Sequence, residues 1–213
     1  MGFSSMLQLH TSKPIDKLDL RQILEELYQG RSLYAFRAGQ TIPMTSQEIW
    51  IVCRGVVSLS TLYPNGEEAL LGLAGSSMPF GLPMTLIYPY QATALSDVDL
   101  MCVSLSDLQQ SATLSQEIFY HLNRRLRQAE AMLAMAGCRR VEDRLRQLIL
   151  LLQMELGQPV SEGTRLSVRL THQHLASAIG TTRVTVTRLL GKLKDEGWLM
   201  IDKSRHIVLP YSW

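Results

Sequence analysis

Hydrophobic residues between Thr171 and Leu193 recur with the period of an α-helix in two short blocks separated by Gly180. Glycine readily adopts the positive φ that ends a helix. Thr171 is the expected N-cap of the first block, and Thr181 or Thr182 that of the second. The apolar positions are Leu175, Ala176 and Ile179 in the first block and Val186, Leu189, Leu190 and Leu193 in the second. This spacing predicts two short amphipathic helices around a tight turn, which is a helix-turn-helix.

The polar face of the second block carries the side chains expected of a DNA-recognition helix. Arg183 lies in its first turn, where an arginine can donate two hydrogen bonds to guanine, and Val184 can contact a thymine methyl group. The alternative is an amphipathic helix whose basic face is merely solvated. The candidate contacts to double-stranded DNA are Thr171, His172, Thr181, Thr182, Arg183, Val184, Thr187, Arg188 and Lys192.

The first half of the chain has a different pattern. Residues 1–30 predict a short helical lead-in, and residues 31–104 contain short apolar or alternating runs broken by Gly and Pro. Pro64-Asn65-Gly66 is typical of a hairpin turn. The predicted strands are Ser32–Phe36, Glu48–Cys53, Val56–Tyr63, Glu68–Leu73, Ala92–Leu95 and Leu100–Val103. Many short strands with frequent turns indicate a β-barrel or jelly roll.

A helix is predicted from Leu105 to Met135, and apolar residues follow a heptad pattern along it. They are Phe119, Leu122, Leu126, Ala129, Leu133 and Ala136. A helix in the core of a bundle would show the same stripe. We favour a homodimer interface, because a single helix-turn-helix reads only half of a site.

Gly137 predicts a hinge, and a further helix is expected over Val141–Leu156. Alternating residues from Leu166 to Leu170 predict a strand, and residues 199–209 predict a hairpin in the position of a wing. The fold class is therefore α+β. We expect a β-roll or jelly-roll domain over residues 1–107, a long dimerisation helix over 108–137 and a winged helix-turn-helix over 138–213.

Composition and charge agree with a cytoplasmic DNA-binding protein. The chain is 46% hydrophobic and 19% charged, and it has neither an apolar run long enough to cross a membrane nor an export signal. Residues 1–138 hold 9 basic and 12 acidic residues, whereas residues 139–213 hold 12 and 7. The positive excess falls on the half with the helix-turn-helix, which is expected if that half meets phosphate.

The sequence offers little for catalysis or metal binding. Cys53, Cys102 and Cys138 are isolated, and the histidines lack metal-ligand spacing, so we expect neither a disulfide framework nor a metal site. A glycine-rich phosphate loop and a nucleophile elbow are both missing from the sequence. We therefore expect that the protein is not an enzyme.

The order of barrel, long helix and winged helix-turn-helix resembles the CRP/FNR superfamily of bacterial transcription regulators over residues 30–210. The segment LTHQHLASAIGTTRVTVTRLLGKLKDEGWLMI is especially similar to the cyanobacterial nitrogen regulators of the NtcA type. The resemblance implies a homodimer that reads a GTA…TAC-type palindrome through Arg183, Val184 and Arg188, with RNA polymerase as a further partner. The general CRP pattern has Glu in place of Val184, so a different half-site is expected.

The barrel resembles the family's cyclic-nucleotide-binding-like domain in its turns, at Gly39, Gly55, Asn65-Gly66-Glu67 and Phe80-Gly81. Members that bind cyclic nucleotides follow Phe-Gly with Glu and then carry an Arg-Ser/Thr-Ala cassette. Here Leu82-Pro83 follows, and the cassette region reads YPYQAT without a cation. A buried phosphate would lack a counter-charge, which argues against cyclic AMP.

The similarity to nitrogen regulators implies a 2-oxoglutarate site, for which the matching residues are Phe80, Gly81, Leu82, Tyr88, Arg125 and Glu130. Tyr88 stands where one of two carboxylate-binding arginines is expected, so one end of a dicarboxylate would lack its partner. Three alternatives stay open: 2-oxoglutarate, another small effector, or none. We expect no resident cofactor. The barrel could instead be a module that senses an effector or binds a partner protein, with DNA binding secondary.

Overall fold

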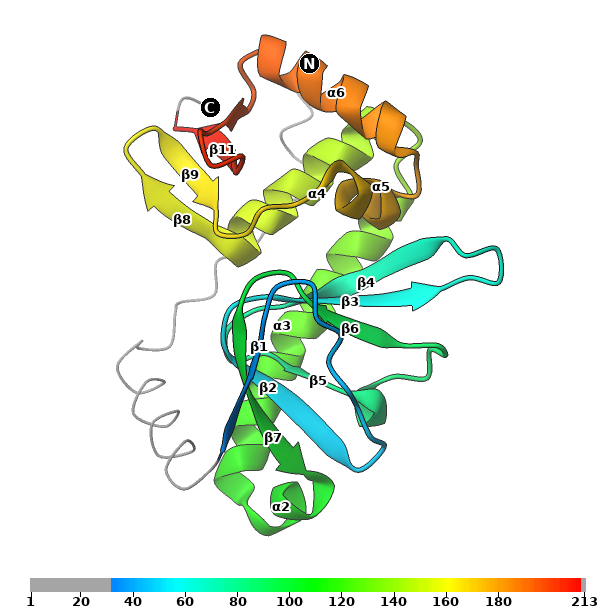
Figure 1. The fold of residues 1–213 in the computed structure, drawn as a ribbon, viewed down its shortest axis with the longest axis vertical. Helices are drawn as coiled ribbons and strands as arrows, with labels where there is room; N and C mark the ends of the chain where they lie inside the picture. Colours follow the sequence, from blue (N-terminus) through cyan, green and yellow to red (C-terminus); the bar gives the residue numbers. More distant parts are fainter. Residues whose placement is uncertain (1–31, 212–213) are drawn as a thin grey trace. The chain divides into compact units, whose positions relative to one another are not determined.

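The computed structural model describes residues 32–211, so the predicted helical lead-in lies outside the described residues. The first elements in chain order are strands that form two antiparallel sheets (Figure 1). They are β1 (Leu33–Phe36), β2 (Glu48–Arg54), β3 (Val57–Leu62), β4 (Glu68–Ala74), β5 (Pro79–Phe80), β6 (Gln91–Ala94) and β7 (Val98–Ser104), with a short 3-10 helix η1 (Leu82–Met84) between β5 and β6. All the strands predicted between residues 32 and 104 are confirmed, and β5 was not predicted because it is only two residues long.

The sheets have the strand orders β1-β7-β2-β5 and β4-β3-β6. Alternate residues point inward and form an apolar core of Ile42, Trp50, Val52, Val57, Leu59, Ala74, Met78, Phe80, Tyr90, Ala92, Ala94, Val98 and Leu100. The hairpin between β3 and β4 turns at Gly66, whose φ of 82° requires the conformational freedom of glycine. The predicted Asn-Gly turn is therefore confirmed.

The predicted helix from Leu105 to Met135 is interrupted. Helix α2 (Leu105–Gln110) ends at Ser111, and α3 (Ala112–Ala136) begins there, because the Ser111 hydroxyl accepts a hydrogen bond from the backbone of Leu114. The prediction of one continuous helix was wrong at this point, since a serine with extended dihedral angles serves better as an N-cap than as a helix interior.

The remaining elements build a winged helix-turn-helix. They are α4 (Val141–Leu156), β8 (Gly157–Val160), β9 (Gly163–Leu166), α5 (His172–Ile179), α6 (Arg183–Asp195), β10 (Met200–Ile201) and β11 (Ile207–Pro210). The four strands form a sheet with the order β10-β11-β9-β8. The strand predicted over residues 166–170 was wrong in extent, because β9 runs from Gly163 and ends at Leu166. Strand β8, which begins at Gly157 directly after α4, was not predicted.

Helix α4 provides the centre of a second core, which also receives the inner faces of α5 and α6. Val56 and Leu73 of the barrel belong to this same cluster, and α5 packs next to β4. Between α3 and α4, Gly137 keeps a right-handed helical φ of −71°, and the chain resumes a helix at Val141. Within residues 32–211, none of the helices has the length and apolar character needed to cross a bilayer.

Candidate nucleic-acid interface

Helix α5 begins with a reciprocal cap. The Thr171 hydroxyl accepts a hydrogen bond from the backbone N–H of His174 at 3.1 Å, and the His174 ring accepts one from the backbone of Thr171 at 3.3 Å. Both bonds satisfy N–H groups that a helix start leaves unpaired. Burial lowers the pKa of His174, which suits its role as a neutral acceptor. Thr171 is therefore the N-cap that the sequence predicted.

The turn between the helices also follows the sequence prediction. Gly180 ends α5 in the left-handed conformation with φ 62°, and Thr182 caps α6 by accepting a hydrogen bond from the backbone of Thr185 at 3.2 Å. A glycine here avoids the strain that a side chain would add. The first turn of α6 is thereby fixed, and the N–H groups that a helix start leaves unpaired suit phosphate oxygens.

The two faces of α6 separate as predicted. Its buried residues are Val186, Leu189, Leu190 and Leu193, and these pack in the core with Leu175, Ala176 and Ile179 of α5. Arg183, Thr187 and Arg188 are exposed, and Val184 is 78% exposed. In the described part of the chain, neither the Arg183 nor the Arg188 guanidinium forms an ion pair. Both cations are therefore available to an external acceptor.

A hydrogen-bonded link joins α5 to the exposed face of α6. The Nδ1 atom of His172 lies 2.7 Å from the Thr187 hydroxyl, which also donates to the carbonyl of Arg183 at 2.9 Å. The structure thus brings together three residues that the sequence marked separately as DNA contacts.

Lys192 lies at the other end of the predicted face, and its ammonium is already engaged. Its Nζ atom is 2.6 Å from a carboxylate oxygen of Glu142 in α4 and 3.7 Å from Glu196. The hydrogen bond to Glu142 raises the pKa of Lys192 and, reciprocally, lowers that of Glu142. Arg146 bonds to the same two carboxylates and stacks over the Trp198 ring at 4.9 Å. A phosphate contact by Lys192 would compete with this network.

A groove of about 710 Å³ runs beside the start of α5 and reaches the wing. Its lining includes three arginines, Arg169, Arg183 and Arg205, and two further predicted contacts, Thr171 and His172, beside apolar residues of the two helices and the wing. Arginines along a groove are the cationic groups that a nucleic-acid backbone attracts.

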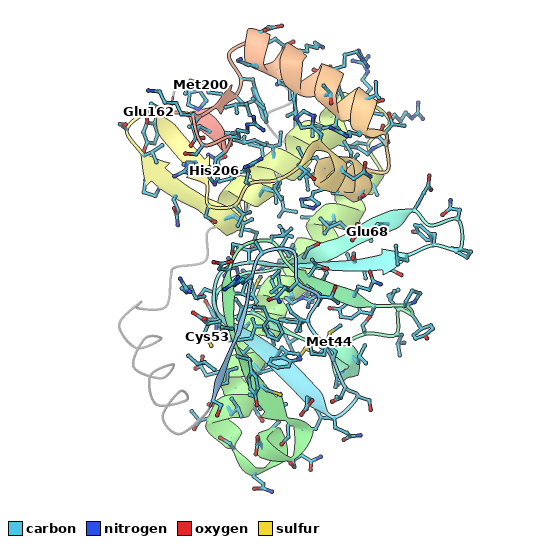
Figure 2. All side chains as sticks on the ribbon, viewed as in Figure 1. Met44, Cys53, Glu68, Glu162, Met200 and His206 are labelled. Atoms are coloured by element: carbon cyan, nitrogen blue, oxygen red, sulfur yellow. The ribbon has the colours of Figure 1, made fainter. Side chains whose placement is uncertain are left out.

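The wing turn is held by side chains at its base. Asp202 pairs with Arg165 at 2.8 Å and accepts a hydrogen bond from the backbone of His206 at 2.8 Å. This backbone bond contributes most to lowering the Asp202 pKa. Arg165 also lies 2.6 Å from the His206 ring, which Figure 2 labels next to β11. The turn places Arg205 at a φ of 64°, a left-handed conformation uncommon outside glycine.

Arg169 and Arg205 are not among the DNA contacts predicted from the sequence. A signal existed for Arg169, because the alternation of Leu166, Val168 and Leu170 leaves Arg169 on the opposite, polar side. Arg205 had no such signal, since its position depends on how the wing turn closes against β9.

Comparison with known proteins agrees with this geometry. Residues 143–211 match the model of a Crp-like helix-turn-helix domain. A global nitrogen regulator from Synechococcus elongatus is 31% identical over 201 residues, which cover 87% of this chain and 90% of the relative. The chain belongs to the CRP/FNR superfamily of transcription regulators.

Other members of this superfamily extend the similarity. The regulatory protein CysR from Synechococcus elongatus is 33% identical over 173 residues, or 80% of each chain. A CRP/FNR-family regulator of known structure from Thermus thermophilus is 25% identical, with a TM-score of 0.68 over 84% of this chain and 93% of its own. The chain is thus a DNA-binding transcription regulator with a cyclic-nucleotide-binding-like barrel, and its relatives are regulators rather than enzymes.

In this CRP/FNR regulator, the six residues predicted to surround an effector lie in different environments. Phe80 is fully buried in the barrel core, whereas the Tyr88 side chain is 94% exposed in the single chain. Gly81 packs so closely that an added Cβ would lie 2.9 Å from the carbonyl of Glu48. Leu82 packs against the core from the first turn of η1. Phe80 thus belongs to the core, whereas Tyr88 lies on the surface of the single chain.

The two α3 residues of that set are also separate. Arg125 donates a hydrogen bond to the carbonyl of Pro79 at 3.2 Å, and Glu130 is exposed. No ion pair joins Arg125 to Glu130 within the residues that the structure describes, so the simple structural pair considered from the sequence is not formed.

The predicted seam forms an exposed apolar stripe along α3. Phe119, Leu126 and Leu133 are 67%, 58% and 76% exposed in the single chain, and Ala129 and Ala136 are exposed as well. Leu122 is half-buried. A different stripe, made of Leu114, Ile118, His121, Gln128 and Met135, is the buried one. The heptad pattern therefore does not mark the face by which α3 packs within its own chain.

Proposed function

We propose that this regulator binds a palindromic GTA…TAC-type DNA site as a homodimer, with one α6 helix in each half-site. The observation that carries the proposal is the exposed face of α6, where Arg183 and Arg188, which form no ion pair with any residue of the described part of the chain, flank Val184. Such a face supplies bidentate donors for guanine together with an apolar contact for thymine.

The exposed stripe on α3 supports the homodimer. Three large apolar side chains at heptad positions are unfavourable in water, and a second copy of the helix would bury them. Dimerisation also gives the protein two recognition helices, which would lie about one turn of DNA apart and so reach the two half-sites.

We assign base contacts to Arg183, Val184, Thr187 and Arg188. Phosphate contacts would come from Thr171, His172, Thr181, Thr182 and Lys192, and the groove adds Arg169 and Arg205. The relatives named global nitrogen regulator and CysR support a regulatory role on DNA. RNA polymerase is the proposed further partner, and the cytoplasm is the proposed place of action.

We propose that cyclic AMP is not the effector of the barrel. Its core residues are apolar, and the fully or nearly buried polar side chains of residues 32–211 include no Arg or Lys. A cyclic phosphate inside would therefore lack a cationic partner. For 2-oxoglutarate, Arg125 could bind one carboxylate only by leaving the Pro79 carbonyl, so we favour a regulator that needs neither ligand.

The test is selection of duplexes from a random pool by the purified protein without any added effector, followed by sequencing. We expect an enriched palindrome with GTA and TAC half-sites. Enrichment of no sequence would contradict the proposal. Enrichment that appears only after cyclic AMP or 2-oxoglutarate is added would contradict the ligand-independent form while leaving DNA recognition intact.

A further inference from the structure

Two hydrogen bonds determine what the Thr187 side chain can offer to DNA. A hydroxyl has one hydrogen, and the carbonyl of Arg183, 2.9 Å away, can only accept it. The Nδ1 atom of His172, 2.7 Å from the same hydroxyl, must then carry a hydrogen and donate it. The hydroxyl of Thr187 is therefore both donating and accepting inside the protein.

The same bonds fix the rotamer of Thr187. A threonine whose hydroxyl bonds to the carbonyl four residues earlier has its Oγ1 directed along the helix, and its γ-methyl occupies the other staggered position on Cβ. Thr187 is exposed on the face that also carries Val184, three residues earlier, a residue that is 78% exposed. Residues three apart are neighbours on a helix surface. The exposed surface between Arg183 and Arg188 therefore contains the methyl groups of two side chains.

We propose that Thr187 recognises a thymine through its γ-methyl group, at a base pair separate from the one contacted by Val184, and that His172 is a positioning residue that holds Thr187 in this rotamer. The inference rests on the proposed function, because it requires α6 to enter the major groove. The C5-methyl of thymine is the apolar group that the major groove presents. Donation from the hydroxyl to a base would require its bond to the Arg183 carbonyl to break, and only its second lone pair stays free to accept a bond from a base.

Replacement of single thymines by deoxyuridine tests the methyl contact, since it removes only the C5-methyl group. On a duplex obtained by selection, wild-type protein should lose affinity about fourfold at each of two thymine positions per half-site, the effect of one lost methyl contact. Thr187→Val keeps a methyl in place, so this variant should still lose affinity when uracil replaces thymine at either position. Thr187→Ser keeps the hydroxyl and should become insensitive to uracil at one position. Val184→Ala is the matched control and should become insensitive at the other position only.

The role of His172 is tested with the ratio of two affinities, that for the duplex with thymine and that for the duplex with uracil at one position. His172→Asn retains an N–H close to the place of Nδ1 and should preserve the fourfold ratio at the Thr187 position. His172→Leu should reduce that ratio toward one, while the ratio at the Val184 position stays unchanged. In the Thr187→Val background, His172→Leu should have no further effect on the ratio, because no hydroxyl remains to be held.

The inference is overturned if Thr187→Ser keeps the sensitivity to uracil while Thr187→Val loses it, since the hydroxyl would then be the recognising group. It is also overturned if a palindrome is selected but no uracil effect depends on residue 187; the proposed function then survives alone. If the protein selects no sequence, the proposed function fails and this inference fails with it.

Discussion

The side-chain oxygen of Gln128 in α3 accepts a hydrogen bond from the backbone N–H of Leu73 in β4, at 2.8 Å. Gln128 is buried, and β4 is the edge strand of its sheet, so this bond satisfies an edge N–H group that water cannot reach. Gly72 makes the approach possible, because a Cβ there would lie 2.7 Å from the same oxygen. The helix that carries the apolar stripe is thereby joined to the barrel.

Gln128→Ala should lower the free energy of unfolding by about 1–3 kcal/mol, since it leaves the Leu73 amide buried without a partner. Urea unfolding at a fixed protomer concentration measures this. Glu130→Ala, on the exposed side of α3, is the control and should have little effect. Gly72→Ala should destabilise wild-type protein more than it destabilises the Gln128→Ala variant. Equal effects in both backgrounds would show that the two residues are not coupled.

Leu133→Asp should prevent dimer formation, because it would place two charges in an apolar interface. We expect dissociation to become at least about 100-fold more favourable. Sedimentation equilibrium of the full chain provides the measurement. Ala134→Asp, at the adjacent exposed position outside the heptad, should leave the dimer intact. If both variants remained dimeric, α3 would not be the dimer interface.

His121 should make the fold acid-sensitive. Burial is the main cause that lowers the pKa of His121 to about 4, and the neighbouring Arg124 adds to it. Among residues 32–211, neither ring nitrogen has a hydrogen-bond partner. The unfolded chain, with a pKa near 6.5, therefore binds the proton first as the pH falls. His121 therefore does not destabilise the fold above pH 6.5. Between pH 6.5 and pH 4 it lowers the free energy of unfolding by at most about 1.4 kcal/mol per pH unit.

Urea unfolding of wild type and His121→Leu between pH 7 and pH 4 tests this assignment. The variant should show a flatter dependence of unfolding free energy on pH, with its advantage over wild type growing as the pH falls. Parallel curves would mean that His121 does not titrate in this window. The pKa of His174 is also lowered by burial, so a smaller slope of the same sign should persist in the variant.

Glu142→Gln should strengthen DNA binding, because it releases the Lys192 ammonium from its ion pair. The expected gain is roughly two- to fivefold, the range for a partly exposed ion pair. The slope of log affinity against log salt should become steeper by about one if Lys192 then contacts phosphate. Glu196→Gln, at the longer distance of 3.7 Å, should change affinity less. An unchanged affinity and slope for Glu142→Gln would remove Lys192 from the phosphate contacts.

The sequence predicted well those features that depend on neighbours along the chain. The buried face of α6, the caps at Thr171 and Thr182 and the turns at Gly66 and Gly180 all follow from spacing and from residue-specific dihedral preferences. These signals act over a few residues, so the fold of the DNA-binding half and the candidate interface could be anticipated.

Features that depend on distant segments could not be anticipated. The face of α3 buried within the chain includes His121 and Gln128, whose polarity conceals it from a hydrophobic pattern. Likewise, the sequence shows only that Lys192 is a lysine on the polar face of its helix. Its ion pair with Glu142, at 2.6 Å, depends on how α4 packs beside α6. Tertiary contacts, not local patterns, set these environments.

The proposal is that a two-fold regulator reads DNA through α6. Its most direct test compares the binding of wild type and Arg183→Ala to the selected palindrome and to every single base-pair variant of it. Equilibrium binding at constant salt gives the affinities. We predict that the variant loses about 1–3 kcal/mol and stops discriminating at one base pair in each half-site, symmetrically placed, while discrimination elsewhere is kept. Equal weakening on all sequences, or a loss confined to one half-site, would contradict the account.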